Sequence, residues 1–271
     1  SDFECLGTEV GPVYNEIRHT LANLRGWMRP ERQPTPLMFL PSTSKVYRDP
    51  LGIVLTIGPW NYPFLLIIQS MVNAIAGGNT VVLKPSDMAP ATAEVIDKLI
   101  RENFPEEYIA VIHGPGDVVG AELVQPYHWD HIFFTGSIPV GKKIMHDAAG
   151  MLSPVTLELG GKSPCIVDRR CDLNVAAKKI AWSKLINAGQ TCVAPDYVMV
   201  HEDVREKFIA KLKQQIVRMY GDDPQKSPDF PRLINKRRFA ALSGYLENAR
   251  ILHGGRQDES DLYIEPTIIE G

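Results

Sequence analysis

The spacing of apolar residues predicts a helix near the N-terminus of the chain, followed by an extended arm. From Val10 to Leu24, apolar side chains recur every three or four positions, which is typical of one face of an α-helix. Three prolines between Arg29 and Pro36 end this pattern, because proline lacks the N–H that a helix interior needs. Residues 37–40 and 45–48 are strand-like, and we expect two strands there.

From Leu51 onward, short apolar runs alternate with longer amphipathic stretches. The short runs predict strands at residues 52–57, 80–83, 108–112, 131–134 and 166–167, and residues 155–157 are also strand-like. Helices are expected at residues 64–76 and 90–102, and others between the later strands. Strands that alternate with helices predict an α/β fold, in which a parallel sheet is covered by helices on both faces.

A second α/β unit is expected to begin near Cys171. It contains a predicted helix at residues 176–185, a strand at 197–201, and helices at 204–220 and 235–248. The sequence therefore divides into a helix with an arm at residues 1–50, a parallel-sheet domain at 51–170, and a further α/β part at 171–271.

Charge and cysteine content narrow the class of protein. Lys and Arg number 29 and Asp and Glu number 32, a net charge of −3, so nothing draws the chain toward nucleic acid or an acidic membrane. The four cysteines have no metal-ligand spacing, and the most apolar stretch, residues 64–76, is too short to span a membrane. We expect a cytoplasmic protein without a metal. Because the first residue is not methionine, a preceding targeting segment is left open.

Three short loops carry side chains suited to covalent chemistry. Cys192 lies in a run of small residues that leaves its thiol accessible, although a lone cysteine is more often a buried apolar residue. Glu158 precedes Gly160 and Gly161, which allow a sharp turn and close packing, and it is a candidate general base or else a solvated charge. Asn61 stands between two prolines, and its amide either serves a turn or donates to an oxyanion.

Other segments suggest a nucleotide site. The stretch from Gly136 to Gly141 joins a strand to a helix, which directs backbone N–H groups toward a pyrophosphate. A P-loop would need Ser or Thr after Lys142, and Lys143 stands there instead. The glycines from Gly114 to Gly120 are one residue too widely spaced for the dinucleotide fingerprint, so a loop that opens a helix is the simpler interpretation.

Together with Val82-Leu83-Lys84-Pro85-Ser86, Phe133-Phe134-Thr135-Gly136-Ser137 and Gln190-Thr191-Cys192-Val193-Ala194-Pro195, these motifs resemble the aldehyde dehydrogenase superfamily. The resemblance runs from about Val10 to the last residue. Segments around Met28-Arg29-Pro30 and Gly221-Asp222-Asp223-Pro224 look closest to the class 3 branch, which accepts NAD or NADP. The resemblance implies a Rossmann-like NAD(P)-binding domain at residues 51–170 and the first part of an α/β catalytic domain at 171–271. It also implies a homodimer whose subunits contact each other through the N-terminal arm.

The resemblance also implies a reaction. Cys192 would attack an aldehyde, the oxyanion would rest on Asn61 and the Cys192 N–H, hydride would pass to the nicotinamide, and Glu158 would activate the water that hydrolyses the thioester. Asp87 stands where the family often has Glu, so the choice between NAD and NADP is open. The residues expected to bind the cofactor are Ile57, Trp60, Lys84, Asp87, Gly114, Gly136, Ser137, Val140, Gly141 and Leu159.

This chain departs from the family pattern at its end, because the pattern continues beyond Gly271. A later motif, whose glutamate binds the nicotinamide ribose, has no counterpart here. Two alternatives therefore accompany the dehydrogenase interpretation: a catalytically impaired fragment, and a cofactor-free thiol esterase that uses the same Cys192 and Glu158.

Overall fold

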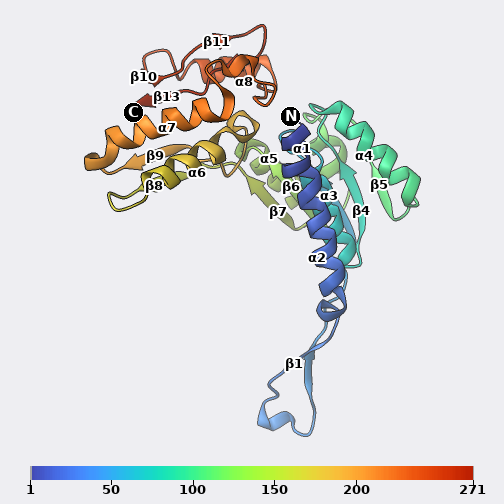
Figure 1. Cartoon of the computed structure of the whole chain (residues 1–271). Helices are drawn as coiled ribbons and strands as arrows, with labels where there is room; N and C mark the ends of the chain where they lie inside the picture. Colours follow the sequence, from blue (N-terminus) through green and yellow to red (C-terminus); the bar gives the residue numbers. More distant parts are fainter. Residues whose placement is uncertain (1, 271) are drawn as a thin grey trace. The chain divides into compact units, whose positions relative to one another are not determined.

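The structure, a computed structural model, describes residues 2–270 (Figure 1). By their internal contacts these residues form two units. One is Leu6–Leu159, and the other joins the described residues of Ser1–Cys5 to those of Gly160–Gly271. The units are defined by contacts within the chain and not by function. The functional domain boundaries expected at residues 50 and 170 therefore stay predictions.

The first unit is built on a five-stranded parallel sheet. Its strands are β3 (Ile53–Ile57), β4 (Thr80–Lys84), β5 (Ile109–Val111), β6 (His131–Gly136) and β7 (Val155–Leu159). They lie in the order β5-β4-β3-β6-β7, so the direction in which the chain adds strands reverses between β3 and β6. The α/β fold predicted from the sequence is confirmed. The strand expected at residues 166–167, in contrast, does not belong to this sheet.

Helices cover both faces of the sheet, and each face has its own apolar core. One core joins β4 and β5 to α2 (Gly11–Trp27), α3 (Leu65–Ala76) and α4 (Pro90–Asn103). The other joins β3, β6 and β7 to η3 (Gly120–Val124) and α5 (Ile138–Ala149). Strands that are buried on both faces have continuous apolar runs in their sequence. This explains why these strands could be predicted from the sequence.

The N-terminal arm differs from its prediction. The helix α2 is preceded by α1 (Asp2–Cys5) and η1 (Leu6–Val10) and leads into an antiparallel pair, β1 (Glu31–Gln33) and β2 (Ser44–Val46). The strand predicted at residues 37–40 is wrong, because Leu37–Phe39 form a short 3₁₀ turn, η2, at the tip of the arm. Prolines at 34, 36 and 41 surround this segment and leave it few N–H groups for a ladder. Figure 1 shows the arm extending away from the end of α2.

In the second unit, a two-stranded parallel sheet packs against two helices. Its strands are β8 (Pro164–Val167) and β9 (Tyr197–Val200), and its helices are α6 (Leu173–Leu185) and α7 (Arg205–Tyr220). The core between them is centred on Val167, Ala177, Ile180 and Phe208. Asp172 caps α6 by accepting hydrogen bonds from the N–H groups of Asn174 and Val175.

The remainder of this unit consists of short elements. These are η4 (Ile186–Gly189), η5 (Glu202–Val204), η6 (Pro224–Lys226), α8 (Lys236–Ser243), the pair β10 (Arg250–His253) with β13 (Ile268–Glu270), and the pair β11 (Gln257–Asp258) with β12 (Tyr263–Ile264). The helix predicted to reach residue 248 stops at Ser243, directly before Gly244, a poor helix former. Within residues 2–270, no helix combines the length and apolar character that crossing a membrane requires.

Candidate active site

Most of the predicted cofactor residues gather where the parallel strands of the first unit end. Ile57 of β3 pairs with Lys84 of β4, and Gly136 of β6, the strand on the other side of β3, pairs with Leu159 of β7. In open α/β sheets, ligands bind at the carboxyl ends of the strands, beside the point where the strand order reverses. Here that point lies between β3 and β6. The register of the sheet therefore brings these four residues to the edge that suits a dinucleotide.

The loop that carries Asn61 follows the carboxyl end of β3 and connects this strand to α3. Its first residue, Gly58, donates its N–H to the Lys84 carbonyl at 3.0 Å, which ties the start of the loop to β4. At the other end, the N–H of Phe64 donates to the Glu9 carboxylate at 2.8 Å. Asn61 and the neighbouring Trp60 are both half-buried. The loop is thus held at both ends, with Asn61 near its centre.

Glu158 lies inside strand β7, opposite Thr135 of β6, and its side chain is exposed. Strand β7 is the last in the order of this sheet, so its ladder with β6 fixes the backbone of Glu158 from one side. The close packing expected around Gly160 and Gly161 is not found among the described residues, because a Cβ added at either glycine would meet no heavy atom within 4 Å. Glu158 therefore owes its position to the sheet and not to the glycines.

A cavity of about 330 Å³ adjoins the buried side chain of Lys84. Lys84 donates from Nζ to the Pro85 carbonyl at 3.0 Å. Burial lowers the pKa of Lys84, and the nearby charge of Asp87 offsets part of this effect. The cavity brings Lys84 together with Gly114, and its other lining residues are Ile112, His113, Pro115, Val118, Val119, Glu122, Leu123, Tyr127 and Trp129.

Sequence reasoning missed most of this cavity, although it singled out the glycine-rich stretch from Gly114 to Gly120. Asp87 is joined to that stretch, because its carboxylate accepts the N–H of Gly116 at 3.2 Å. On the far side, the indole of Trp129 donates to the Leu123 carbonyl at 2.9 Å. The signals for the cavity in the sequence were Lys84, at the end of its strand, and that run of glycines, which marks a loop following a strand.

The start of α5 presents a different set of predicted residues. Ser137 is the N-cap, is exposed, and makes no side-chain capping bond, and Val140 is also exposed. Gly141, in contrast, is buried, and a Cβ there would lie 2.7 Å from Cδ2 of Leu159. Gly141 therefore allows α5 to pack against β7, and the exposed end of the helix belongs to Ser137 and Val140.

The loop before Cys192 adopts an unusual backbone conformation. Asn187 and Ala188 have φ of 52° and 51°, and Gly189 has φ of 78°. Asn187 and Ala188 are strained, since residues with a Cβ rarely adopt this left-handed region, whereas glycine adopts it freely. Cys192 follows as an exposed, unbridged thiol, which satisfies the accessibility that a nucleophile needs.

A carboxylate from the N-terminus supports this loop. Glu4 accepts the N–H of Asn187 at 3.2 Å. Burial raises the pKa of Glu4, and the hydrogen bond from Asn187 opposes this rise. The two residues lie 183 positions apart in the sequence, so periodicity and motifs gave no indication of the contact.

The three predicted catalytic residues are divided between the units. Asn61 and Glu158 belong to the unit Leu6–Leu159, and Cys192 belongs to the unit that contains Gly160–Gly271. Their joint role in catalysis stays a prediction. Among residues 2–270, no group of three or more His, Cys, Asp or Glu side chains is placed to hold a metal ion.

Known proteins share this sequence and this fold. The profile of the aldehyde dehydrogenase family matches residues 4–271. Aldehyde dehydrogenase family 3 member B3 of Mus musculus is 44% identical over 99% of this chain and 56% of its own length. The dimeric, NADP-preferring aldehyde dehydrogenase of Rattus norvegicus is 43% identical over 96% of this chain and 57% of its own length.

Among solved structures, the substrate-bound state of Staphylococcus aureus AldH superposes with a TM-score of 0.93 at 41% identity, and covers 98% of this chain and 58% of the other. The chain thus spans a little over half the length of the relatives it matches. The resemblance inferred from Cys192, Glu158 and their surrounding motifs is confirmed, and this chain belongs to the aldehyde dehydrogenase family.

Proposed function

We propose that this protein oxidises an aldehyde to a carboxylic acid with NAD or NADP, and that Cys192 is its nucleophile. The observation that carries the proposal is the gathering of the predicted cofactor residues at one edge of a parallel sheet, beside a cavity of about 330 Å³. A thiol, a carboxylate and an amide on separate loops supply the groups that thioester chemistry needs.

The residues at this edge fit a dinucleotide. Lys84 and Asp87 present an ammonium and a carboxylate suited to ribose hydroxyls, and Gly114 leaves open space beside them because a Cβ there would meet no heavy atom within 4 Å. The exposed N-terminus of α5, at Ser137 and Val140, suits a pyrophosphate. When bound, the nicotinamide supplies the acceptor for hydride. Ile57, Trp60, Gly136, Gly141 and Leu159 shape the site.

The covalent steps follow from the three catalytic residues. The Cys192 thiolate attacks the aldehyde carbon and forms a C–S bond, while the Asn61 amide donates to the oxyanion that develops on the carbonyl oxygen. One such donor is typically worth about 3 kcal/mol of transition-state stabilisation. After oxidation, Glu158 takes a proton from water, and the hydroxide attacks the thioester carbon. The C–S bond breaks, the carboxylic acid leaves, and the Cys192 thiolate is restored.

The arm provides the basis for a proposed homodimer. Leu37 and Met38 at its tip are 85% and 82% exposed, and apolar side chains gathered in this way are typical of an interface. A relative at 43% identity is named as dimeric. The proposed location is the cytoplasm, and the proposed small-molecule partner is an aldehyde.

The experiment that tests the function follows cofactor reduction by its absorbance, with an aldehyde panel and each of NAD and NADP, and uses Cys192→Ala as the matched control. Aldehyde-dependent reduction that disappears in the variant supports the proposal. Hydrolysis of an activated ester without any cofactor reduction would instead favour the thiol esterase. Absence of both activities in the 271-residue chain would indicate the catalytically impaired alternative.

A further inference from the structure

Gln190, two residues before Cys192, forms hydrogen bonds through both the nitrogen and the oxygen of its side-chain amide. Its Nε2 donates to the carbonyl of Asn187 and to the carbonyl of Arg232, each at 3.1 Å. Its Oε1 accepts the N–H of Ile234 at 3.0 Å. One side chain therefore joins the strained part of the loop to a segment more than forty residues away.

The chemistry of the amide explains why glutamine suits this place. Its NH₂ group has two donors and its oxygen accepts, so one planar group can serve two carbonyls and one N–H. The backbone N–H of Gln190 also donates to the Asn187 carbonyl at 3.0 Å. A carboxylate of the same shape would accept from Ile234 but would face two carbonyl oxygens without a proton to offer.

The strain before Gln190 requires such a support. Asn187 and Ala188 hold left-handed conformations that persist in proteins only where the surrounding structure imposes them. Gly189 follows with φ of 78°, and a Cβ there would lie 3.0 Å from the Lys184 carbonyl. Without the bond from Gln190 to the Asn187 carbonyl, this turn loses one of the contacts that close it.

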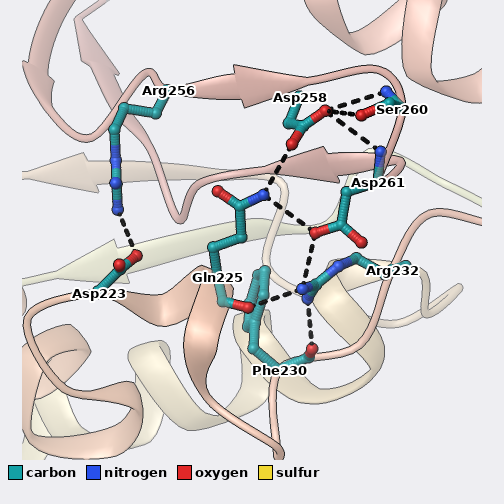
Figure 2. A network of polar contacts seen from close by, with 8 residues as sticks. All are labelled: Asp223, Gln225, Phe230, Arg232, Arg256, Asp258, Ser260 and Asp261. Atoms are coloured by element: carbon teal, nitrogen blue, oxygen red, sulfur yellow. Dashed lines mark hydrogen bonds and ion pairs between the residues drawn. The ribbon is translucent and has the colours of Figure 1, made fainter.

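The acceptor at Arg232 is itself held firmly. The Arg232 guanidinium donates to the carbonyls of Gln225 at 2.7 Å and Phe230 at 2.9 Å. It pairs with the Asp261 carboxylate at 2.9 Å and lies 5.2 Å from the centre of the Tyr263 ring. Figure 2 shows these bonds meeting at the guanidinium. The backbone of Arg232 is therefore a fixed point to which Gln190 can bind.

A second layer of bonds fixes the acid that pairs with Arg232. The amide of Gln225 donates to Asp261 at 3.0 Å and to Asp258 at 2.9 Å. The hydrogen bond from Arg232 lowers the pKa of Asp261, so the carboxylate stays ionised to a more acidic pH than an ordinary aspartate. Arg256, which pairs with Asp223 at 2.9 Å, stands apart from these bonds in Figure 2.

We propose that Gln190 is a positioning residue for Cys192. Arg232 provides the fixed carbonyl to which the Gln190 amide binds. The amide clamps the left-handed turn against the segment 232–234, so the loop presents the thiol and the Cys192 N–H in one orientation. This inference rests on the proposed function, in which that thiol is the nucleophile.

The test compares Gln190→Glu and Arg232→Lys with the wild-type chain, and uses Arg256→Lys as the matched control. Alkylation of the Cys192 peptide by iodoacetamide is followed by mass spectrometry across a range of pH. In both test variants we expect the alkylation rate to change by about tenfold and its pH profile to move, because the loop no longer holds the thiol and the Cys192 N–H in one orientation. Arg256→Lys is expected to match the wild type.

An unchanged rate and an unchanged midpoint in a folded Gln190→Glu variant would overturn the proposal. If that variant does not fold, as judged by circular dichroism, Arg232→Lys carries the same test, since lysine keeps the charge and lacks the planar fork. Alkylation requires neither cofactor nor aldehyde. A wild-type chain that oxidises no aldehyde therefore refutes the proposed function, while a change confined to the two test variants still establishes the clamp.

Discussion

The Glu9 carboxylate accepts a hydrogen bond at 2.8 Å from the N–H of Phe64, the N-cap residue of α3, which lies 55 residues later in the chain. The N–H of Leu65 donates to the same oxygen at 3.3 Å. Helix α3 has no side-chain cap at its own N-cap position, so Glu9 satisfies donors that would lack a partner and places a negative charge at the positive end of the helix. Because Asn61 lies in the loop just before this helix, the cap also holds the candidate oxyanion donor.

Replacing Glu9 by alanine is expected to destabilise the protein by about 1 kcal/mol, the usual cost of losing a helix cap. In a domain of this size that corresponds to a fall of roughly 2–4 °C in Tm. Thermal unfolding measures the change. Glu16→Ala is the control, because Glu16 contacts Gln69 of the same helix only through a long 3.4 Å bond. Equal Tm values for the two variants would argue against the cap.

Cys192→Ala is expected to abolish both aldehyde oxidation and ester hydrolysis and to leave cofactor binding intact. Alanine cannot form the covalent intermediate, so both reactions should stop. The proposed cofactor residues lie elsewhere, at the carboxyl ends of the strands of the five-stranded sheet, so cofactor binding should remain. Steady-state assays and a cofactor titration measure the two effects. More than a few per cent of residual turnover would remove Cys192 from its proposed role.

Glu158→Gln is expected to slow deacylation more than acylation. An amide cannot take a proton from water, whereas the attack of the thiolate does not require that base. A rapid pre-steady-state burst of reduced cofactor should therefore survive while steady turnover collapses. If the burst disappears as well, Glu158 acts on the Cys192 thiol instead.

Asp87→Glu is expected to shift the preference toward NAD over NADP. The longer carboxylate reaches a ribose 2′-hydroxyl better and repels a 2′-phosphate more, and a difference of about 1.4 kcal/mol changes the ratio tenfold. The ratio of kcat/KM for the two cofactors measures it. An unchanged ratio would show that Asp87 serves mainly to bind the Gly116 N–H and leaves the ribose to Lys84.

Acid is expected to weaken the first unit through Asp147. Burial raises the pKa of this carboxyl, but hydrogen bonds with Gln125 and His146 and the charge of Lys143 outweigh burial and leave the pKa below its usual value. A lowered folded pKa gives stability that is present above the unfolded pKa, about 3.9, and is lost as pH falls below it. Asp147→Asn should flatten the stability profile in that range when unfolding is measured in denaturant at each pH. A profile as steep as that of the wild type would exclude Asp147 as its source.

The sequence predicted the parts of the fold that depend on local periodicity. The strands ending at Ile57 and Lys84 are continuous apolar runs, because both faces of the sheet are buried. It failed where another influence decided the structure. Prolines gave the tip of the arm a 3₁₀ turn, Gly244 ended α8 early, and residues 166–167 joined β9 instead of the main sheet.

The candidate site divides in the same way. Motifs located Cys192, Glu158 and Asn61, since each stands in a short run of distinctive residues. Among the groups that hold their loops, Glu4 and Glu9 stand in no such run, and Gln190 lies in the Cys192 motif without any sign of its partners. Their partners are 183, 55 and 42 positions away, and nothing in the spacing of residues reveals a contact at such separations.

The place of Glu158 within strand β7 limits how this region can evolve. Side chains alternate between the two faces of a strand, so deletion of a single residue between Val155 and Glu158 would turn the carboxylate to the opposite face. The loops on either side can change length without such an effect. We therefore expect natural insertions and deletions among related sequences to avoid residues 155–158.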